Sequence, residues 1–151
     1  MVDRLILIDT TPRYTDELRT MWAVRAKAAR DDGVRALIEG LLPIWFTPEA
    51  IAANIAPVRY VRETLARCPG EGYALACEAL ASADLREDTK RIAAPTLVVC
   101  GDADIPSFID AARWLAENIS GAESAWIPRA RHASVAERPD QALRLMRDFL
   151  R

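Results

Sequence analysis

The chain has 151 residues, of which 51% are hydrophobic and 28% charged, so it holds enough apolar material for one compact core. Its formal net charge is −2, and its basic residues are interleaved with acidic ones. This pattern argues against a nucleic-acid partner and against binding to an anionic membrane surface. The apolar runs are far shorter than the roughly 18 residues that a membrane-spanning helix needs.

The first residues lack the basic, apolar and small-residue regions of a secretory signal, and we therefore expect a cytoplasmic protein. The cysteines, Cys68, Cys77 and Cys100, are odd in number and have no C-x-x-C spacing. This argues against a disulfide framework and against a zinc site. We expect three reduced, packed thiols and no bound metal.

The chain opens on an apolar strand, residues 5–9, which is followed by Thr10, Thr11 and Pro12. A strand that is apolar on both faces is typical of the interior of a parallel sheet, where a neighbour pairs with each edge. We therefore expect that part of the fold precedes these residues. Without it, the free edge would bind a second copy of the chain or a complementing chain.

Residues 15–83 have helical periodicity, with Thr15 as an N-cap and Thr47-Pro48 as a second helix start. From residue 84 the pattern changes to strand 96–100, helix 108–119, strand 124–127 and helix 139–150, which is a right-handed βαβ unit. The sequence thus predicts an α/β fold with three parallel strands and covering helices. Residues 1–14 and 84–151 would form the core, and residues 15–83 a helical lid.

The only histidine, His132, follows one predicted strand, and Asp104 follows the neighbouring one. Loops after adjacent parallel strands emerge at one edge of the sheet, where ligands of such sheets bind. Asp104 could therefore orient the imidazole of His132, as the acid of a catalytic triad does. The alternative is a solvated histidine and a turn-forming aspartate.

Residues 95–150 closely resemble the end of α/β-hydrolases, in which an acid in G-x-x-D follows the seventh strand and the histidine precedes Glu-x-Pro. Gly101 and Asp104 occupy the first motif, and His132, Glu137 and Pro139 occupy the second. The resemblance implies that Asp104 and His132 are the catalytic acid and histidine. Asp102 and Asp9 remain alternatives for the acid, although Asp9 is also suited to capping a turn with Thr10 and Thr11.

Upstream, "VDRLILIDTTP" resembles the family's sixth strand, and residues 15–83 resemble its cap. Within the family, the segments "IWFTPEA", "PGEGYALACEAL" and "DLREDTKRIAAPTLVV" are most similar to 3-oxoadipate enol-lactonases. The resemblance implies a cofactor-free hydrolase of small esters or lactones, acting in aromatic degradation by the β-ketoadipate route.

The departure from the family is the missing nucleophile elbow, since no G-x-S-x-G is present and the oxyanion-hole segments are absent as well. We therefore expect a chain truncated before the elbow and inactive alone. The alternatives are a non-catalytic remnant or binding module, and a piece that complements a separate N-terminal chain. The serines of the chain all lie outside an elbow context: Ser82, Ser107, Ser120, Ser124 and Ser134.

Aromatic residues of the lid are candidates for substrate binding. Trp45 and Phe46 lie beside the Thr47 helix start and could provide an apolar roof for a lactone ring. Trp22 is a further candidate, although core packing is the stronger expectation for it. A carboxylated substrate would also require a cation, which Arg25 or Arg59 could supply.

Overall fold

The computed structural model describes residues 2–151, and the chain divides into two compact units. The first contains residues 2–12, 44–47 and 85–151, and the second contains residues 13–43 and 48–84. The short segment 44–47 therefore groups with the first unit, although its neighbours on both sides in the sequence belong to the second.

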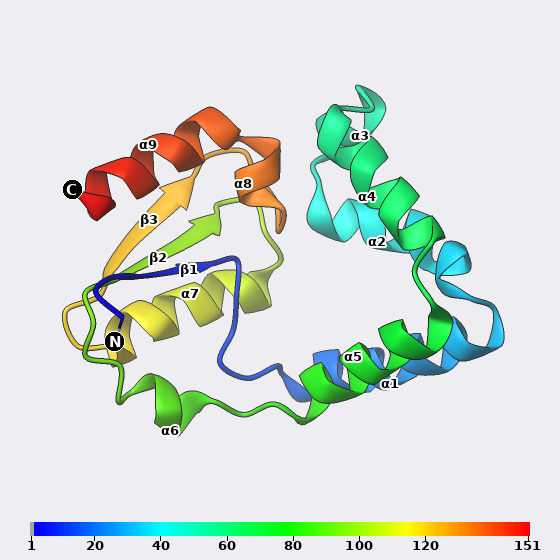
Figure 1. Cartoon of the computed structure of the whole chain (residues 1–151), viewed down its shortest axis with the longest axis horizontal. Coiled ribbons are helices and arrows are strands. Elements are labelled where there is room, and N and C mark those ends of the chain that lie inside the picture. Colours follow the sequence, from blue (N-terminus) through cyan, green and yellow to red (C-terminus); the bar gives the residue numbers. More distant parts are fainter. Residues whose placement is uncertain (1) are drawn as a thin grey trace. The chain divides into compact units, whose positions relative to one another are not determined.

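The first unit is built on a parallel sheet of β1 (Leu5–Ile8), β2 (Thr96–Gly101) and β3 (Glu123–Ile127), in that spatial order (Figure 1). Leu5 pairs with Thr96, and Leu97 pairs with Glu123. The predicted α/β fold with three parallel strands is confirmed, and each strand lies within a residue of its predicted bounds.

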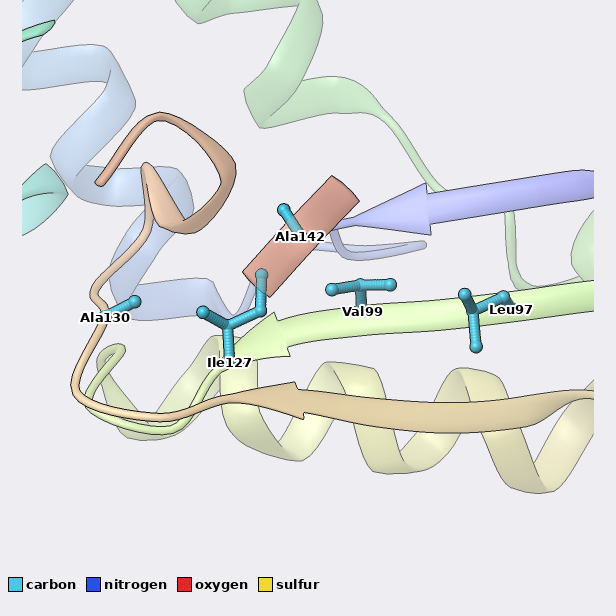
Figure 2. Close-up of a cluster of buried hydrophobic side chains, with 5 residues drawn as sticks. All are labelled: Leu97, Val99, Ile127, Ala130 and Ala142. Atoms are coloured by element: carbon cyan, nitrogen blue, oxygen red, sulfur yellow. The ribbon is translucent and has the colours of Figure 1, made fainter. Parts of the chain in front are cut away.

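Helices cover both faces of the sheet, with α7 (Pro106–Asn118) on one and α9 (Pro139–Leu150) on the other. Alternate residues of β2 supply the two cores. Leu97 and Val99 pack with Ala142 of α9, as Figure 2 shows. Val98 and Cys100 pack with Leu115 of α7. A strand with a continuous apolar run, residues 97–100, therefore becomes the central strand, because both of its faces are covered.

β1 differs from the expectation of a strand buried on both faces. All of its residues are only half-buried, whereas every residue of β2 is buried. The reason is its position at an edge of the described sheet. β1 pairs with β2 on one side, and no described strand covers its other side. Its apolar side chains still pack on both cores, Ile6 and Ile8 toward α9 and Leu7 toward α7.

The second unit is helical. In it α1 (Asp16–Asp31) packs against α5 (Gly70–Ser82) around Ala26, Ala74 and Cys77. Thr15 caps α1 as predicted, accepting a hydrogen bond from the Leu18 amide at 3.3 Å.

The remaining elements of the two units are the 3₁₀ turn η1 (Val34–Leu37), α2 (Ile38–Trp45), α3 (Pro48–Ala52), α4 (Ala56–Ala66), α6 (Arg86–Thr89) and α8 (Ser134–Glu137).

None of the helices among residues 2–151 is long and apolar enough to cross a bilayer, in line with the short apolar runs of the sequence.

Candidate active site

Asp104 and His132 meet at the carboxyl edge of the sheet. Asp104 follows β2, His132 lies in the loop after β3, and Asp104 Oδ2 is 2.9 Å from His132 Nδ1. The other oxygen, Oδ1, accepts a hydrogen bond from the Ile105 amide at 2.7 Å. The Asp104 side chain has no exposed area, whereas that of His132 is 23% exposed. The carboxylate is thus held in place while the imidazole stays accessible.

The imidazole also packs on an aromatic ring. Phe108, a buried residue in the first turns of α7, has its ring centroid 4.0 Å from that of His132, at an interplanar angle of 38°. With Nδ1 facing Asp104 and one ring face against Phe108, the orientation of the imidazole is fixed. A proton on Nδ1 would leave Nε2 with a free lone pair, which is the state required of a general base.

Gly101 allows the histidine loop to approach the end of β2. A Cβ atom at this position would lie 2.3 Å from the Ala130 carbonyl oxygen and 2.6 Å from that of Arg131. Just after it, Asp102 accepts a hydrogen bond from the Arg129 amide at 2.6 Å, and Arg129 has φ of 55°. The carboxylate of Asp102 therefore braces the turn after β3, while that of Asp104 contacts the histidine.

Asp9 joins the ends of the strands. Its Oδ1 accepts a hydrogen bond from the Gly101 amide at 3.1 Å, and its Oδ2 accepts from the amide and hydroxyl of Ser134 at 3.0 and 2.6 Å. Burial raises the pKa of Asp9, and these hydrogen bonds oppose the shift. The sequence favoured a local role in capping Thr10 and Thr11, which stays a prediction. The hydrogen bonds described here join Asp9 to residues 92 and 125 positions away along the chain.

Cys100 lies among these carboxylates but is a poor nucleophile. Burial, followed by the nearby charges of Asp9 and Asp104, raises the pKa of its thiol to about 12. Ligand-type atoms of Asp9, Cys100 and Asp104 lie within 4.8 Å of one another, which is close enough to surround a metal ion. The carboxylate oxygens are already engaged in hydrogen bonds, however, and the thiol resists ionisation, so the group is poorly suited to a cation.

The aromatic candidates have different surroundings. Trp45 is half-buried, and its carbonyl accepts a hydrogen bond from the Ala133 amide at 2.8 Å, next to His132. Phe46 is completely buried, which leaves it no exposed surface for a ligand in this structure. Trp22 belongs to the helical unit, where it packs on the α1–α5 core and meets Tyr14 edge-on at 5.4 Å.

Comparison with known proteins identifies the fold. The chain is 34% identical over 118 residues to 3-oxoadipate enol-lactonase 2 of Acinetobacter baylyi, a match that covers 78% of this chain and 44% of that protein. Against 3-oxoadipate enol-lactonase 1 of the same organism it is 31% identical over 130 residues, which is 86% of this chain and 48% of that protein.

Among solved structures, the enol-lactonase of Burkholderia xenovorans superposes with a TM-score of 0.91 at 34% identity, covering 99% of this chain and 56% of that one. The chain belongs to the α/β-hydrolase superfamily. A hydrolase of Pseudomonas aeruginosa also superposes on this α/β-hydrolase chain, with a TM-score of 0.89 at 28% identity over 98% of this chain and 55% of that one. No protein-family model matches the chain.

The α/β-hydrolase chain spans about half the length of the curated relatives that it matches. Two of its structural features have no signal in the sequence. The Glu-x-Pro motif marks Glu137 but does not indicate Thr47 as its partner, 90 residues away. Likewise, nothing in the sequence around Asp9, the acid that follows β1, indicates that its carboxylate binds Ser134. Such pairs become visible only when the strands and loops are placed in space.

Proposed function

We propose that this chain supplies the histidine and the acid of a serine-dependent ester or lactone hydrolase resembling the 3-oxoadipate enol-lactonases. The observation that carries the proposal is the 2.9 Å contact between Asp104 Oδ2 and His132 Nδ1 at the carboxyl edge of the sheet. The helical unit, residues 13–43 and 48–84, would act as the cap. The similarity to enol-lactonases supports a small lactone as the substrate class.

In this mechanism, Nε2 of His132 takes the proton of an attacking serine hydroxyl and returns it to the leaving oxygen. A water molecule, activated by the same nitrogen, then hydrolyses the acyl-enzyme. Asp104 keeps the other ring proton on Nδ1 and stabilises the imidazolium that forms in each step. Trp45, whose backbone is joined to the residue after His132, is the aromatic residue that we propose faces the substrate.

The nucleophile must come from outside these residues. The sequence has no G-x-S-x-G, and the hydroxyl of Ser134, the serine closest in sequence to His132, is bound to Asp9 at 2.6 Å. The oxyanion donors of the family come from the elbow and from an earlier loop. Loss of a single oxyanion donor costs roughly 2.7–4 kcal/mol of transition-state stabilisation, so the chain by itself is expected to be inactive.

The test compares two forms of the protein on a chromogenic ester and on the enol-lactone of 3-oxoadipate. The chain alone should show no hydrolysis above its His132→Ala variant, and a serine-directed phosphonate should label none of its serines. A form extended by the upstream coding residues, if these encode the elbow, should hydrolyse the lactone and lose that activity on His132→Ala.

Stoichiometric phosphonate labelling of the chain alone would contradict the requirement for an external serine. An extended form that contains an elbow serine and yet remains inactive toward both substrates would instead favour the second candidate. That candidate is a non-catalytic binding module, which the missing elbow also supports.

A further inference from the structure

Glu137 is a buried carboxylate at the end of α8 that the proposed chemistry does not use. Its Oε1 accepts hydrogen bonds from the amide of Thr47, at 3.2 Å, and from the Thr47 hydroxyl. Its Oε2 accepts from the Arg131 amide at 3.1 Å. One side chain thus joins the segment 44–47 to the loop that carries His132.

A second contact joins the same two segments without involving Glu137. The Ala133 amide donates to the Trp45 carbonyl at 2.8 Å. Arg131 and Ala133 are the residues on either side of His132, so the histidine backbone is held on one side by Glu137 and on the other by Trp45. This explains why residues 44–47 group with the first unit rather than with the helices around them.

We propose that Glu137 is a positioning residue that couples the placement of Trp45 to that of His132, so that the substrate-facing wall and the general base form one rigid element. This inference rests on the proposed function for its catalytic meaning. Hydrogen bonds to a carboxylate are shorter and stronger than neutral ones, and two acceptor oxygens of fixed spacing set the separation of the segments that they join. Without them, the Thr47 and Arg131 amides would lose their hydrogen bonds to Glu137.

The test is amide hydrogen exchange of the whole chain, measured residue by residue by NMR, for the wild type and Glu137→Gln. The amide group of glutamine offers one acceptor oxygen and one donor, so it cannot accept from both segments. We expect exchange at Thr47 and Arg131 to rise at least about tenfold. The decisive residue is Ala133, whose amide does not contact Glu137 and should accelerate as well, together with a shift of the His132 ring signals.

The matched control is Glu117→Gln, an exposed glutamate of α7, which should leave these amides and the β2 amides unchanged. The coupling would be overturned if exchange became faster at Thr47 and Arg131 while the Ala133 amide and the His132 ring signals stayed unchanged. If Glu137→Gln also opens β2, Thr47→Val decides, because it removes the hydroxyl that donates to Glu137 while leaving the carboxylate and the Thr47 and Arg131 amides in place. It should accelerate Ala133 by a smaller factor, and an unchanged Ala133 would contradict the proposal.

These measurements need no turnover, so they separate this inference from the proposed function. In an active extended form, Glu137→Gln should raise KM for the lactone as well as lower kcat, because the substrate wall and the base shift together. If the extended form is inactive but the exchange pattern is as expected, the proposed function fails while the coupling stands. A fall in kcat at constant KM would overturn the link to the substrate wall.

Discussion

At the scale of single residues, the carboxylates around His132 have separate tasks. Asp104 contacts the imidazole, Asp102 binds the Arg129 amide, and Asp9 connects Gly101 with Ser134. The G-x-x-D pattern of the sequence selects Asp104, and of these three carboxylates it is the one 2.9 Å from the His132 ring, while its catalytic role stays a prediction. The tasks differ because each carboxylate leaves its strand at a different point and therefore meets different donors.

The first prediction concerns the tautomer of His132. Asp104→Asn keeps the shape but presents an amide N–H, so the neutral imidazole should move its proton from Nδ1 to Nε2. Nitrogen-15 NMR can follow this without ambiguity, because the chain has a single histidine. In an active extended form the same change should lower kcat by about 10⁴-fold. Asp110→Asn, on the exposed face of α7, is the control, and an unchanged tautomer in Asp104→Asn would refute the orienting role.

The second prediction concerns thiol reactivity and its dependence on pH. The pKa of Cys100 is raised to about 12 and that of Cys77 is raised by burial, so both stay protonated near neutral pH. Only the thiolate reacts, and its fraction at Cys100 grows as pH rises toward the raised pKa. At pH 8 an alkylating reagent should therefore modify Cys68, which is half-buried, well before the other two.

Mass spectrometry of the digested protein measures the order of modification, and the denatured chain, in which all three cysteines should react alike, is the control. Rapid alkylation of Cys100 in the native chain at pH 8 would show that its thiol is neither buried nor surrounded by carboxylates as described.

At the scale of elements, the close approach of the histidine loop to the end of β2 depends on Gly101. Gly101→Ala would place a methyl group 2.3 Å from the Ala130 carbonyl oxygen, and backbone on both sides leaves little room for it to move. We expect a loss of about 1–3 kcal/mol in the free energy of unfolding and a displaced His132. Urea denaturation and the His132 ring signals measure these effects.

Gly40→Ala is the matched control for this substitution. Gly40 lies inside α2, and a Cβ atom there would meet nothing within 4 Å. Gly40→Ala should leave the free energy of unfolding unchanged or raise it by up to about 1 kcal/mol, because alanine favours the helix more than glycine does. Equal effects of the two substitutions would mean that the loop does not need the close approach at Gly101.

At the scale of the whole molecule, the edge of β1 that faces away from β2 is paired with no other strand of residues 2–151. The Leu5 and Asp9 amides donate to the Pro95 and Val99 carbonyls, so the alternation of a strand directs the Ile6 and Ile8 amides away from β2. An unpaired apolar strand is a template for association. We predict that the chain associates through this edge at micromolar concentration or requires another chain there.

Sedimentation velocity across a range of concentrations tests the edge. The sedimentation coefficient should rise with concentration, and addition of a chain that supplies the preceding strand should abolish the rise. A compact monomer that melts cooperatively with this edge open to water would contradict the prediction.

The sequence by itself determined the parallel strands, the helices between them, and the pair Asp104 and His132. The strands and helices follow from local information, namely apolar runs and helical periodicity. The pair was predicted from the resemblance of residues 95–150 to α/β-hydrolases, because spacing alone left a solvated histidine as the alternative. It also determined that no serine elbow is present, which is a fact of composition and order.

Only the tertiary structure decided which strand is central, that segment 44–47 groups with the sheet, and that Asp9 and Glu137 hold the histidine loop. Each of these depends on hydrogen bonds between residues distant in the sequence, such as Thr47 with Glu137. A buried carboxylate takes whichever donors the folded backbone brings to it, and those donors are fixed by the packing of the strands rather than by neighbouring residues.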